Sequence, residues 1–208
     1  MNTALIINSI FAVQKAILAN EANIESLDRA IGDGDHFINV RRGCEVTAEL
    51  AKDLKDELPA QVFHKIGMKL LSTIGGASGP LISSFFMAMG KALEGVTEPS
   101  RAQFAIAFGA GVDAIKSRGK ADLGEKTMLD VLIPAARLLQ NFAHEPIELE
   151  KLCKLLKEDA HANMLFTKDM IATKGRAHFL GERALGHIDP GSKTCEVAIG
   201  AVCDLLTA

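Results

Sequence analysis

Apolar residues recur at intervals of three and four along most of the chain, the spacing of one face of an α-helix. No stretch shows the clean apolar–polar alternation of a β-strand bounded by turn residues. The pattern therefore predicts an all-α fold in a single domain over residues 1–208. Helices are expected over residues 3–19 (capped by Thr3), 21–29, 36–55, from 59 onward, 78–93, 100–117, 128–142 with a kink at Pro134, 148–166 and 194–205.

Composition removes several classes of protein. The chain has 208 residues, 48% of them hydrophobic, which is enough for one domain with a sizeable core. A net charge of −3 gives no basic face, so nucleic acid is not an expected partner. The four cysteines form no C-x-x-C pair, which favours reduced thiols in a cytosolic protein. There is no signal peptide, and no apolar run approaches the roughly 20 residues that span a bilayer, so we expect no membrane contact and a cytoplasmic location.

Four glycine-rich polar segments interrupt the helical pattern, at residues 30–35, 74–79, 119–126 and 174–191. Each combines glycine with Asp, Ser, Lys or Arg. Loops gathered at one end of a helical bundle form a polar pocket above an apolar interior. The sequence therefore places the candidate chemistry in these four segments.

The first segment carries three carboxylates within eight positions: Asp28, Asp33 and Asp35. Carboxylates this close repel one another unless a cation lies between them, and their oxygens suit a hard cation such as Mg²⁺ or Ca²⁺. An EF-hand is excluded, because the required Gly at its sixth position is replaced by Ile38 or Val40. The alternative interpretation is a solvated turn in which Asp35 caps the helix that follows.

The second segment, Ile74-Gly-Gly-Ala-Ser-Gly-Pro80, lies between two predicted helices. Small residues leave its backbone N–H groups accessible, and Ser78 stands where a helix begins. Unpaired N–H donors at a helix N-terminus, together with the helix dipole, favour an anion. A tight turn between helices with Ser78 as an ordinary cap remains the alternative.

Residues 119–127 almost spell a P-loop, but Glu125 is inserted between Gly124 and Lys126. A P-loop also follows a β-strand, whereas the residues before Gly119 are predicted to be helical. We therefore reject a P-loop and expect Thr127 to cap the next helix.

The fourth segment, residues 174–191, is the longest irregular stretch, which indicates function or mobility. Arg176 has the chemistry to pair with a phosphate, and Asp189-Pro190-Gly191 forms a turn able to close over a base or ribose. The alternative for Arg176 and Arg183 is ordinary surface ion pairing.

Together these motifs resemble one known family. The segments LDRAIGDGDH, GGASGPL, GEKTMLD and KGRAHFLGERALGHIDPG are similar to those of the L subunit of dihydroxyacetone kinase (the DhaL family), in the same order and over essentially the whole chain. That family binds nucleotide in the bacterial phosphotransferase-dependent enzyme. The resemblance implies an antiparallel barrel of about eight helices with a nucleotide at one end.

The resemblance also implies roles for individual residues. Asp28, Asp33 and Asp35 would hold about two Mg²⁺ ions that bridge the phosphates. The residues expected to contact ADP or ATP are His36, Phe37, Ile38, Asn39, Ala77, Ser78, Gly119, Met128, Arg176, Asp189, Pro190 and Gly191. No catalytic nucleophile is expected on this chain, because the sugar is held on a separate K subunit and a phosphohistidine-bearing phosphotransferase (M) subunit recharges ADP in place.

Two departures from the family pattern concern the sugar and the partner more than the nucleotide. Phe37 stands where a small residue is usual, so it is expected to narrow the rim or change how a partner docks. Residues 192–195 are less rich in small residues than is typical. Alternatives for the function are the same module serving another short ketose such as a tetrulose, or an ADP-bound regulator that binds a transcription factor. A homodimer is left open.

Overall fold

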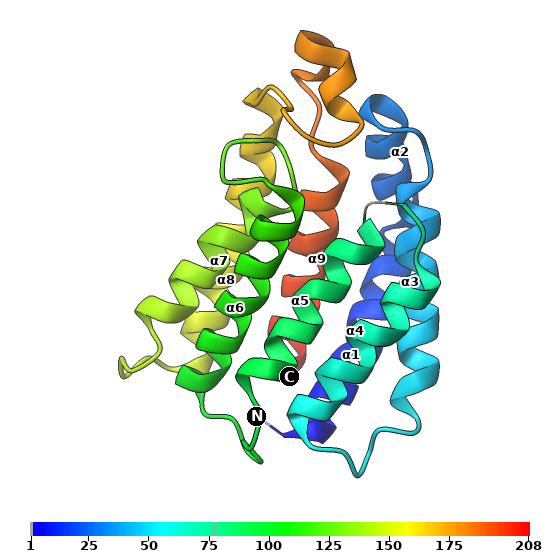
Figure 1. The fold of residues 1–208 in the computed structure, drawn as a ribbon. Coiled ribbons are helices and arrows are strands. Elements are labelled where there is room, and N and C mark those ends of the chain that lie inside the picture. Colours follow the sequence, from blue (N-terminus) through cyan, green and yellow to red (C-terminus); the bar gives the residue numbers. More distant parts are fainter. Residues whose placement is uncertain (1, 77) are drawn as a thin grey trace.

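The computed structural model describes residues 2–76 and 78–208, so the predicted contact at Ala77 lies outside the described residues. The described chain contains α-helices and short 3₁₀-helices and no strand, which confirms the all-α prediction. The α-helices, labelled in Figure 1, are α1 (Thr3–Ala19), α2 (Glu21–Ile31), α3 (His36–Ala51), α4 (Pro59–Thr73), α5 (Ser78–Ala92), α6 (Arg101–Gly119), α7 (Leu129–Asn141), α8 (Leu149–Phe166) and α9 (Pro190–Leu206). The 3₁₀-helices are η1 (Thr167–Asp169) and η2 (Ala177–Ala184).

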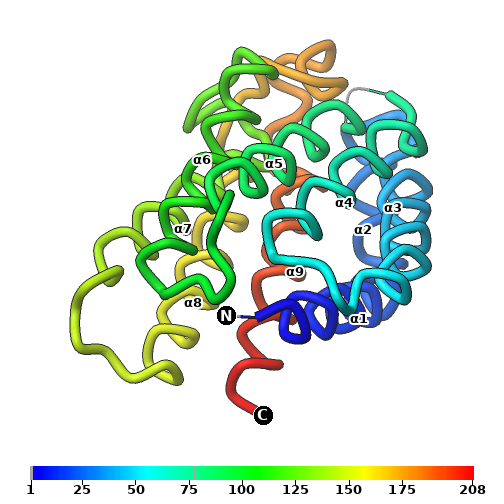
Figure 2. The backbone as a smooth tube through the Cα atoms, turned by 60° about the horizontal axis from the view of Figure 1, so that its bottom comes forward, coloured from blue at the N-terminus to red at the C-terminus, as the bar shows by residue number. Residues whose placement is uncertain are grey.

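The long helices form a closed ring. Contacts run from α1 to α3, then through α4, α5, α6, α7, α8 and α9 in turn, and α9 returns to α1. Figure 2 shows this ring obliquely from below. Helix α2 is not a member of the ring and contacts α3 and α9. Consecutive members of the ring run in opposite directions, so the antiparallel barrel of eight helices is confirmed.

Local side-chain chemistry explains where several helices begin. Ser100 and Gln103 form a capping box at the start of α6, in which each side chain accepts a hydrogen bond from the other residue's backbone N–H. Asn2, not Thr3, caps α1, because its Oδ1 accepts from the N–H of Leu5 at 2.9 Å. The predicted cap was wrong because the Thr3 hydroxyl instead donates to the carbonyl of Glu57, 2.6 Å away.

Two predicted helix boundaries were also wrong. Helix α3 ends at Ala51 rather than at Lys55, and turns follow it. Helix α9 begins at Pro190 rather than at Thr194. Asp189 accepts a hydrogen bond from the N–H of Ser192, and a proline suits the first position of a helix, so the Asp-Pro-Gly turn is a helix start.

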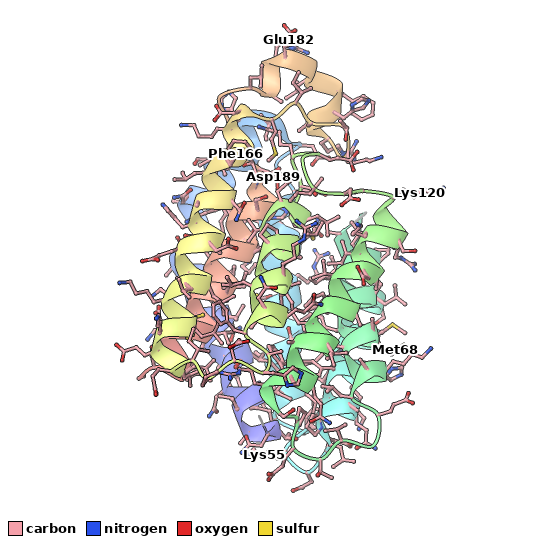
Figure 3. All side chains as sticks on the ribbon, turned by 90° about the vertical axis from the view of Figure 1, so that its left-hand side faces the viewer. Lys55, Met68, Lys120, Phe166, Glu182 and Asp189 are labelled. Atoms are coloured by element: carbon pink, nitrogen blue, oxygen red, sulfur yellow. The ribbon has the colours of Figure 1, made fainter. Side chains whose placement is uncertain are left out.

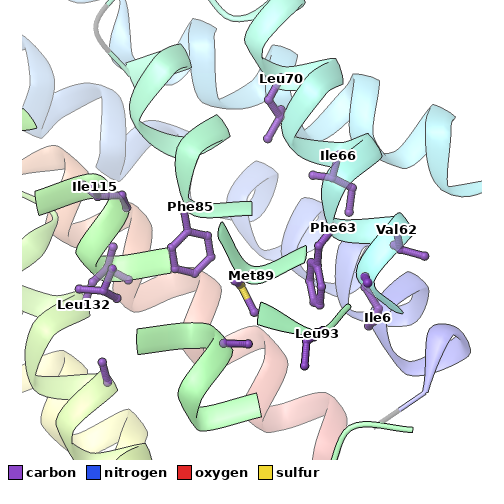
Figure 4. Close-up of a cluster of buried hydrophobic side chains, with 14 of the residues drawn as sticks. Ile6, Val62, Phe63, Ile66, Leu70, Phe85, Met89, Leu93, Ile115 and Leu132 are labelled. Carbon is purple, nitrogen blue, oxygen red and sulfur yellow. The ribbon is translucent and has the colours of Figure 1, made fainter. Parts of the chain in front are cut away.

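The largest hydrophobic cluster lies inside the ring and draws on most of its helices. Figure 4 shows Phe63, Phe85 and Met89 converging there. Phe85 meets Phe86 and Phe108 edge-on, with ring centroids 5.2 and 5.4 Å apart, an arrangement favoured by the ring quadrupoles. Gly67 of α4 lets α5 approach closely, because a Cβ there would lie 2.6 Å from the Met87 side chain. This core fixes the helix ends that carry the polar loops.

All four polar segments lie at the same end of the barrel, the upper end in Figure 1, while both termini lie toward the opposite end. Figure 3 shows Glu182 and Asp189 toward this end and Lys55 at the other. The expectation that the loops gather at one end is therefore confirmed.

In residues 2–76 and 78–208, no single helix is long and apolar enough to cross a membrane; by length and composition alone, only the pair α1 and α2, bent by 65°, passes such a test.

Candidate functional site

The acidic turn between α2 and α3 is organised by Asp28. This residue is 4% exposed, and its Oδ2 accepts a hydrogen bond from the N–H of His36 at 3.0 Å. Asp35 stands at the cap position of α3, but its side chain makes no capping hydrogen bond. The alternative in which the Asp35 side chain caps α3 is therefore wrong. The Asp28 carboxylate instead accepts from the N–H of His36, the first residue of α3.

Asp33 and Asp35 lie close enough to interact electrostatically. Burial raises the pKa of Asp35, and the neighbouring Asp33 raises it further by repulsion and by a hydrogen bond between the two side chains. The Asn39 side chain also hydrogen-bonds Asp35 and partly offsets this rise in pKa. A cation placed between the two carboxylates would remove the repulsion.

The donor set suits Mg²⁺ only with help from a ligand. Within the part of the chain that the structure describes, no three His, Cys, Asp or Glu side chains are grouped so that they could hold a metal by themselves. Mg²⁺ in nucleotide sites usually takes one or two carboxylates and completes its shell with phosphate oxygens and water. Three oxygen-only side chains around one turn fit that mode of binding, with Asp33 and Asp35 the more accessible pair.

Arg176 reaches this acidic turn from a distant part of the sequence. Its Nε lies 2.7 Å from Asp33 Oδ2, while its side chain remains 70% exposed. Arg176 therefore forms an ion pair, as the alternative interpretation expected, but its partner Asp33 is one of the candidate metal ligands. The structure thus brings the first and fourth predicted segments together.

The residues that open α3 divide between the site and the core. His36 Nε2 lies 2.8 Å from the Thr194 hydroxyl, and burial lowers the pKa of His36 while the charges of Asp28 and Asp35 oppose that shift. Ile38 is 46% exposed, and the Asn39 side chain bonds to Asp35.

The expectation that the Phe37 side chain narrows the rim of the site was wrong. It is 2% exposed and packs with Ile17, Ile24 and Val197. Successive helical residues point about 100° apart, so Phe37 points into the core while its neighbours His36 and Ile38 point in other directions. Its substitution for a small residue is therefore a change in the core.

The second segment forms a tight turn before α5. Gly76 has a φ of +68°, and Ser78 is the first residue of α5. A Cβ on Gly79 would lie 2.2 Å from the carbonyl oxygen of Ile74, so only glycine fits there. Ser78 thus stands at a helix N-terminus. Both interpretations of this segment, a phosphate site and an ordinary turn, predict that position.

Of the remaining predicted residues, Met128 and Asp189–Gly191 lie around the start of α9, whereas Gly119 does not. A Cβ on Gly191 would be 3.5 Å from the Cβ of Met128, so these two sequence-distant residues are neighbours. Gly119 ends α6, close to Leu81 of α5. Pro190 is buried, and burial raises the pKa of Asp189 to about 6 despite its hydrogen bonds with Ser192.

Sequence reasoning missed a buried polar network beneath these residues. Lys126, Asp130, Thr167 and Ser192 are each at most 1% exposed. Asp130 accepts hydrogen bonds from the N–H groups of Gly124 (2.5 Å) and Thr127 (2.7 Å), and the Ser192 hydroxyl donates to the carbonyl of Thr127 (2.7 Å). Nothing in the local sequence indicates that Lys126 is buried, because its burial depends on segments more than 40 positions away.

A hollow of about 520 Å³ adjoins this end but differs from the predicted site. Its lining residues are Asp113, Lys116, Ser117, Lys120, Ala121, Asp122 and Glu125. Carboxylates outnumber lysines in this lining, and Lys116 already pairs with Asp122 at 2.9 Å. The hollow therefore favours a phosphate less than the surroundings of Arg176 do.

Comparison with known proteins identifies the family. The DAK2 domain model matches residues 30–204. This chain belongs to the DAK2 domain family. It is 40% identical over 178 residues to the PTS-dependent dihydroxyacetone kinase, ADP-binding subunit DhaL, of Lactococcus lactis, covering 86% of this chain and 84% of that protein. The Escherichia coli PEP-dependent dihydroxyacetone kinase, ADP-binding subunit DhaL, is 37% identical, with 81% of this chain and 80% of that protein covered, so the DAK2 chain is similar to DhaL subunits over most of its length.

Some longer relatives match this chain over only part of their own length. The human triokinase/FMN cyclase is 32% identical over 93% of this chain, which spans only 34% of that protein. The crystal structure of the dihydroxyacetone kinase of C. freundii superposes with a TM-score of 0.76 at 28% identity, over 97% of this chain and 34% of that one. The same enzyme in complex with AMP-PNP and Mg²⁺ superposes with a TM-score of 0.75. The DAK2 chain therefore shares its whole fold with about a third of that kinase.

Proposed function

We propose that this chain is the nucleotide-binding subunit of a phosphoenolpyruvate-phosphotransferase-dependent dihydroxyacetone kinase, which holds ADP or ATP with about two Mg²⁺ ions at Asp28, Asp33 and Asp35. Residues 1–208 act as one nucleotide-binding domain. Phosphate passes from a phosphohistidine on an M subunit to bound ADP, and from the resulting ATP to dihydroxyacetone held on a K subunit. A DhaL-type chain works with other subunits, as the names of its relatives state.

The observation that carries the proposal is the ion pair between Arg176 and Asp33. It joins a cation suited to phosphate with a carboxylate suited to Mg²⁺, at the barrel end that also carries Ser78, Met128 and Asp189. Phosphoryl transfer depends mainly on positioning and charge stabilisation, which metal ions, an arginine and backbone donors supply. Support for a substrate on another chain comes from the absence of a G-x-S-x-G motif or a Cys–His signature in the sequence.

The nucleotide is the first thing to test. Protein purified without added nucleotide is heated and the released small molecules are separated by ion-exchange chromatography. We expect ADP or ATP at about one equivalent, or uptake of ADP on incubation with Mg²⁺ that EDTA reverses. Protein that neither carries nor gains nucleotide contradicts the proposal.

The partners are tested by reconstitution. Adding K and M subunits, dihydroxyacetone, phosphoenolpyruvate and the general phosphotransferase proteins should give dihydroxyacetone phosphate and pyruvate. A tetrulose phosphorylated in preference to dihydroxyacetone would identify another short ketose as the substrate. ADP binding without any sugar phosphorylation, combined with binding to a transcription regulator, would instead identify a regulatory protein.

A further inference from the structure

Lys126 is the one lysine that the structure describes as fully buried, with 1% of its surface exposed. It lies in the loop between α6 and α7 and has a φ of +59°. Its Nζ donates hydrogen bonds to the carbonyls of Thr167 (2.5 Å) and His187 (2.6 Å). Burying an ammonium group is costly unless its donors are satisfied, so a lysine held in this way indicates a specific task.

The two carbonyls lie on either side of the segment 168–186, which carries η2 and Arg176. The chain closes on itself there, because the N–H of Gly186 donates to the carbonyl of Lys168 at 2.8 Å. Lys126 thus binds both ends of this segment at its base. Removal of its ammonium group would leave two carbonyl oxygens without this donor.

Glu125, the preceding residue, holds a third point of the same segment. Its carbonyl accepts from the N–H of Thr173 at 3.3 Å, and its Oε1 accepts from the Thr173 hydroxyl at 2.7 Å. Lys174 Nζ lies 3.7 Å from the same carboxylate oxygen. Further along, the segment rests on α2, where Ala172, Ala177 and Ala184 pack against Ile31.

The residues that hold the segment 168–186 also contact the start of α9. The carbonyl of Thr167 binds Lys126, and the hydroxyl oxygen of Thr167 accepts a hydrogen bond from the N–H of Asp189 at 3.0 Å. On the other side, Ser192 donates to Thr127, the residue after Lys126. The turn of residues 189–191 is therefore held from both directions by residues bonded to Lys126 or next to it in the chain.

We propose that Lys126 is a positioning residue for the nucleotide site, which anchors the segment 168–186 at its base and so sets the place of Asp189–Gly191. This inference rests on the proposed function for the identity of the ligand. Lys126 acts through these residues, since its side chain is buried and its Nζ donates to two backbone carbonyls. Burial lowers the pKa of Lys126, and the negative charges of Asp189, Asp169 and Asp130 oppose that shift.

The test compares Lys126→Met, which keeps the length of the side chain but removes its donors, with Thr167→Val, which breaks the next link while leaving Lys126 in place. The matched control is Lys154→Met on α8, where the side chain is 74% exposed. Limited trypsin digestion reports the anchor, because Lys174, Arg176 and Arg183 lie within the anchored segment. Titration calorimetry with Mg²⁺·ADP and with Mg²⁺·pyrophosphate reports the site.

We expect Lys126→Met to speed cleavage within residues 174–183 and to weaken Mg²⁺·ADP binding by about tenfold, the effect of losing a hydrogen bond to a charged group. Binding of Mg²⁺·pyrophosphate should weaken as well, because Arg176, the proposed cation for the phosphates, lies within the anchored segment. Thr167→Val should shift both readouts in the same direction, and it decides the matter if Lys126→Met does not fold. Lys154→Met should match the wild-type protein.

Wild-type cleavage and wild-type ADP affinity in Lys126→Met would overturn the proposal. Weaker binding with cleavage spread over the whole chain, not concentrated within residues 174–183, would also overturn it, because that result indicates a general loss of structure. A wild-type protein that binds neither ligand would instead contradict the proposed function, and the rate of cleavage would then judge the anchor alone.

Discussion

Arg176 Nε lies 2.7 Å from Asp33 Oδ2, so a residue of the 168–186 segment closes directly onto the acidic turn between α2 and α3. Both groups have other partners in the proposed function: Mg²⁺ for the carboxylate and a phosphate for the guanidinium. The two charges therefore satisfy each other without a ligand and are expected to separate when Mg²⁺ and nucleotide enter.

Arg176→Ala should lower phosphoryl transfer in the reconstituted kinase by about 100-fold or more, as is typical when a charge that stabilises the transition state is removed. The free energy of unfolding should change by less than about 1 kcal/mol, because the pair is largely exposed to water. Arg183→Ala is the matched control, since Arg183 makes only a long contact of 3.5 Å to the carbonyl of Leu180. Equal losses in the two variants would show that Arg176 has no special role.

Asp35→Asn and Asp28→Ala should separate metal binding from helix capping. Asp35→Asn is expected to abolish Mg²⁺-dependent retention of ADP without lowering thermal stability, because it removes repulsion from Asp33. Asp28→Ala should also cost about 1 kcal/mol of unfolding free energy, since it deprives the His36 N–H of its acceptor. Chemical denaturation and nucleotide release measure the two effects. Retained ADP in Asp35→Asn would count against a metal at this turn.

The sequence predicts features that depend on local interactions better than features that depend on contacts between distant residues. Helical periodicity is local, so the helices themselves were predicted correctly apart from some of their boundaries, whereas the barrel was implied by the family resemblance. The start of α9 was missed because Asp189-Pro190 signals both a turn and a capped helix. Phe37 was placed on the rim because it follows the acidic motif directly in the sequence. In the structure it is buried against Ile24 and Val197, which lie on other helices.

The least predictable features join distant parts of the chain. No local signal pairs Arg176 with Asp33, and none buries Lys126 beneath Thr167 and His187. Lysine is normally exposed, so the residue type of Lys126 gives no indication of its burial. These contacts depend on how the helices close into a ring, which periodicity alone does not specify.

Gly79→Ala should destabilise the protein by roughly 2 kcal/mol or more, the scale of a forced overlap in a packed region. The added Cβ would lie 2.2 Å from the carbonyl oxygen of Ile74 and push apart the turn that presents Ser78. Gly75→Ala is the control, because a Cβ there meets nothing within 4 Å. Thermal unfolding and ADP binding should change in the first variant far more than in the second. Similar effects in both would show that the turn adapts freely.

Asp189→Asn should change how stability depends on pH. Burial raises the pKa of Asp189 to about 6, above its ordinary value of 3.8, so between these values the folded protein binds a proton that the unfolded chain does not. The free energy of unfolding then falls as pH rises through this window, and Asp189 contributes most stability below it. Asparagine carries no charge and still caps a helix well, so the variant should lose this part of the pH dependence and be no less stable at about pH 7. Chemical denaturation of both proteins at several pH values across this window measures the difference. Parallel pH profiles in the two proteins would mean that folding leaves the pKa of Asp189 unchanged and that Lys126 compensates its burial.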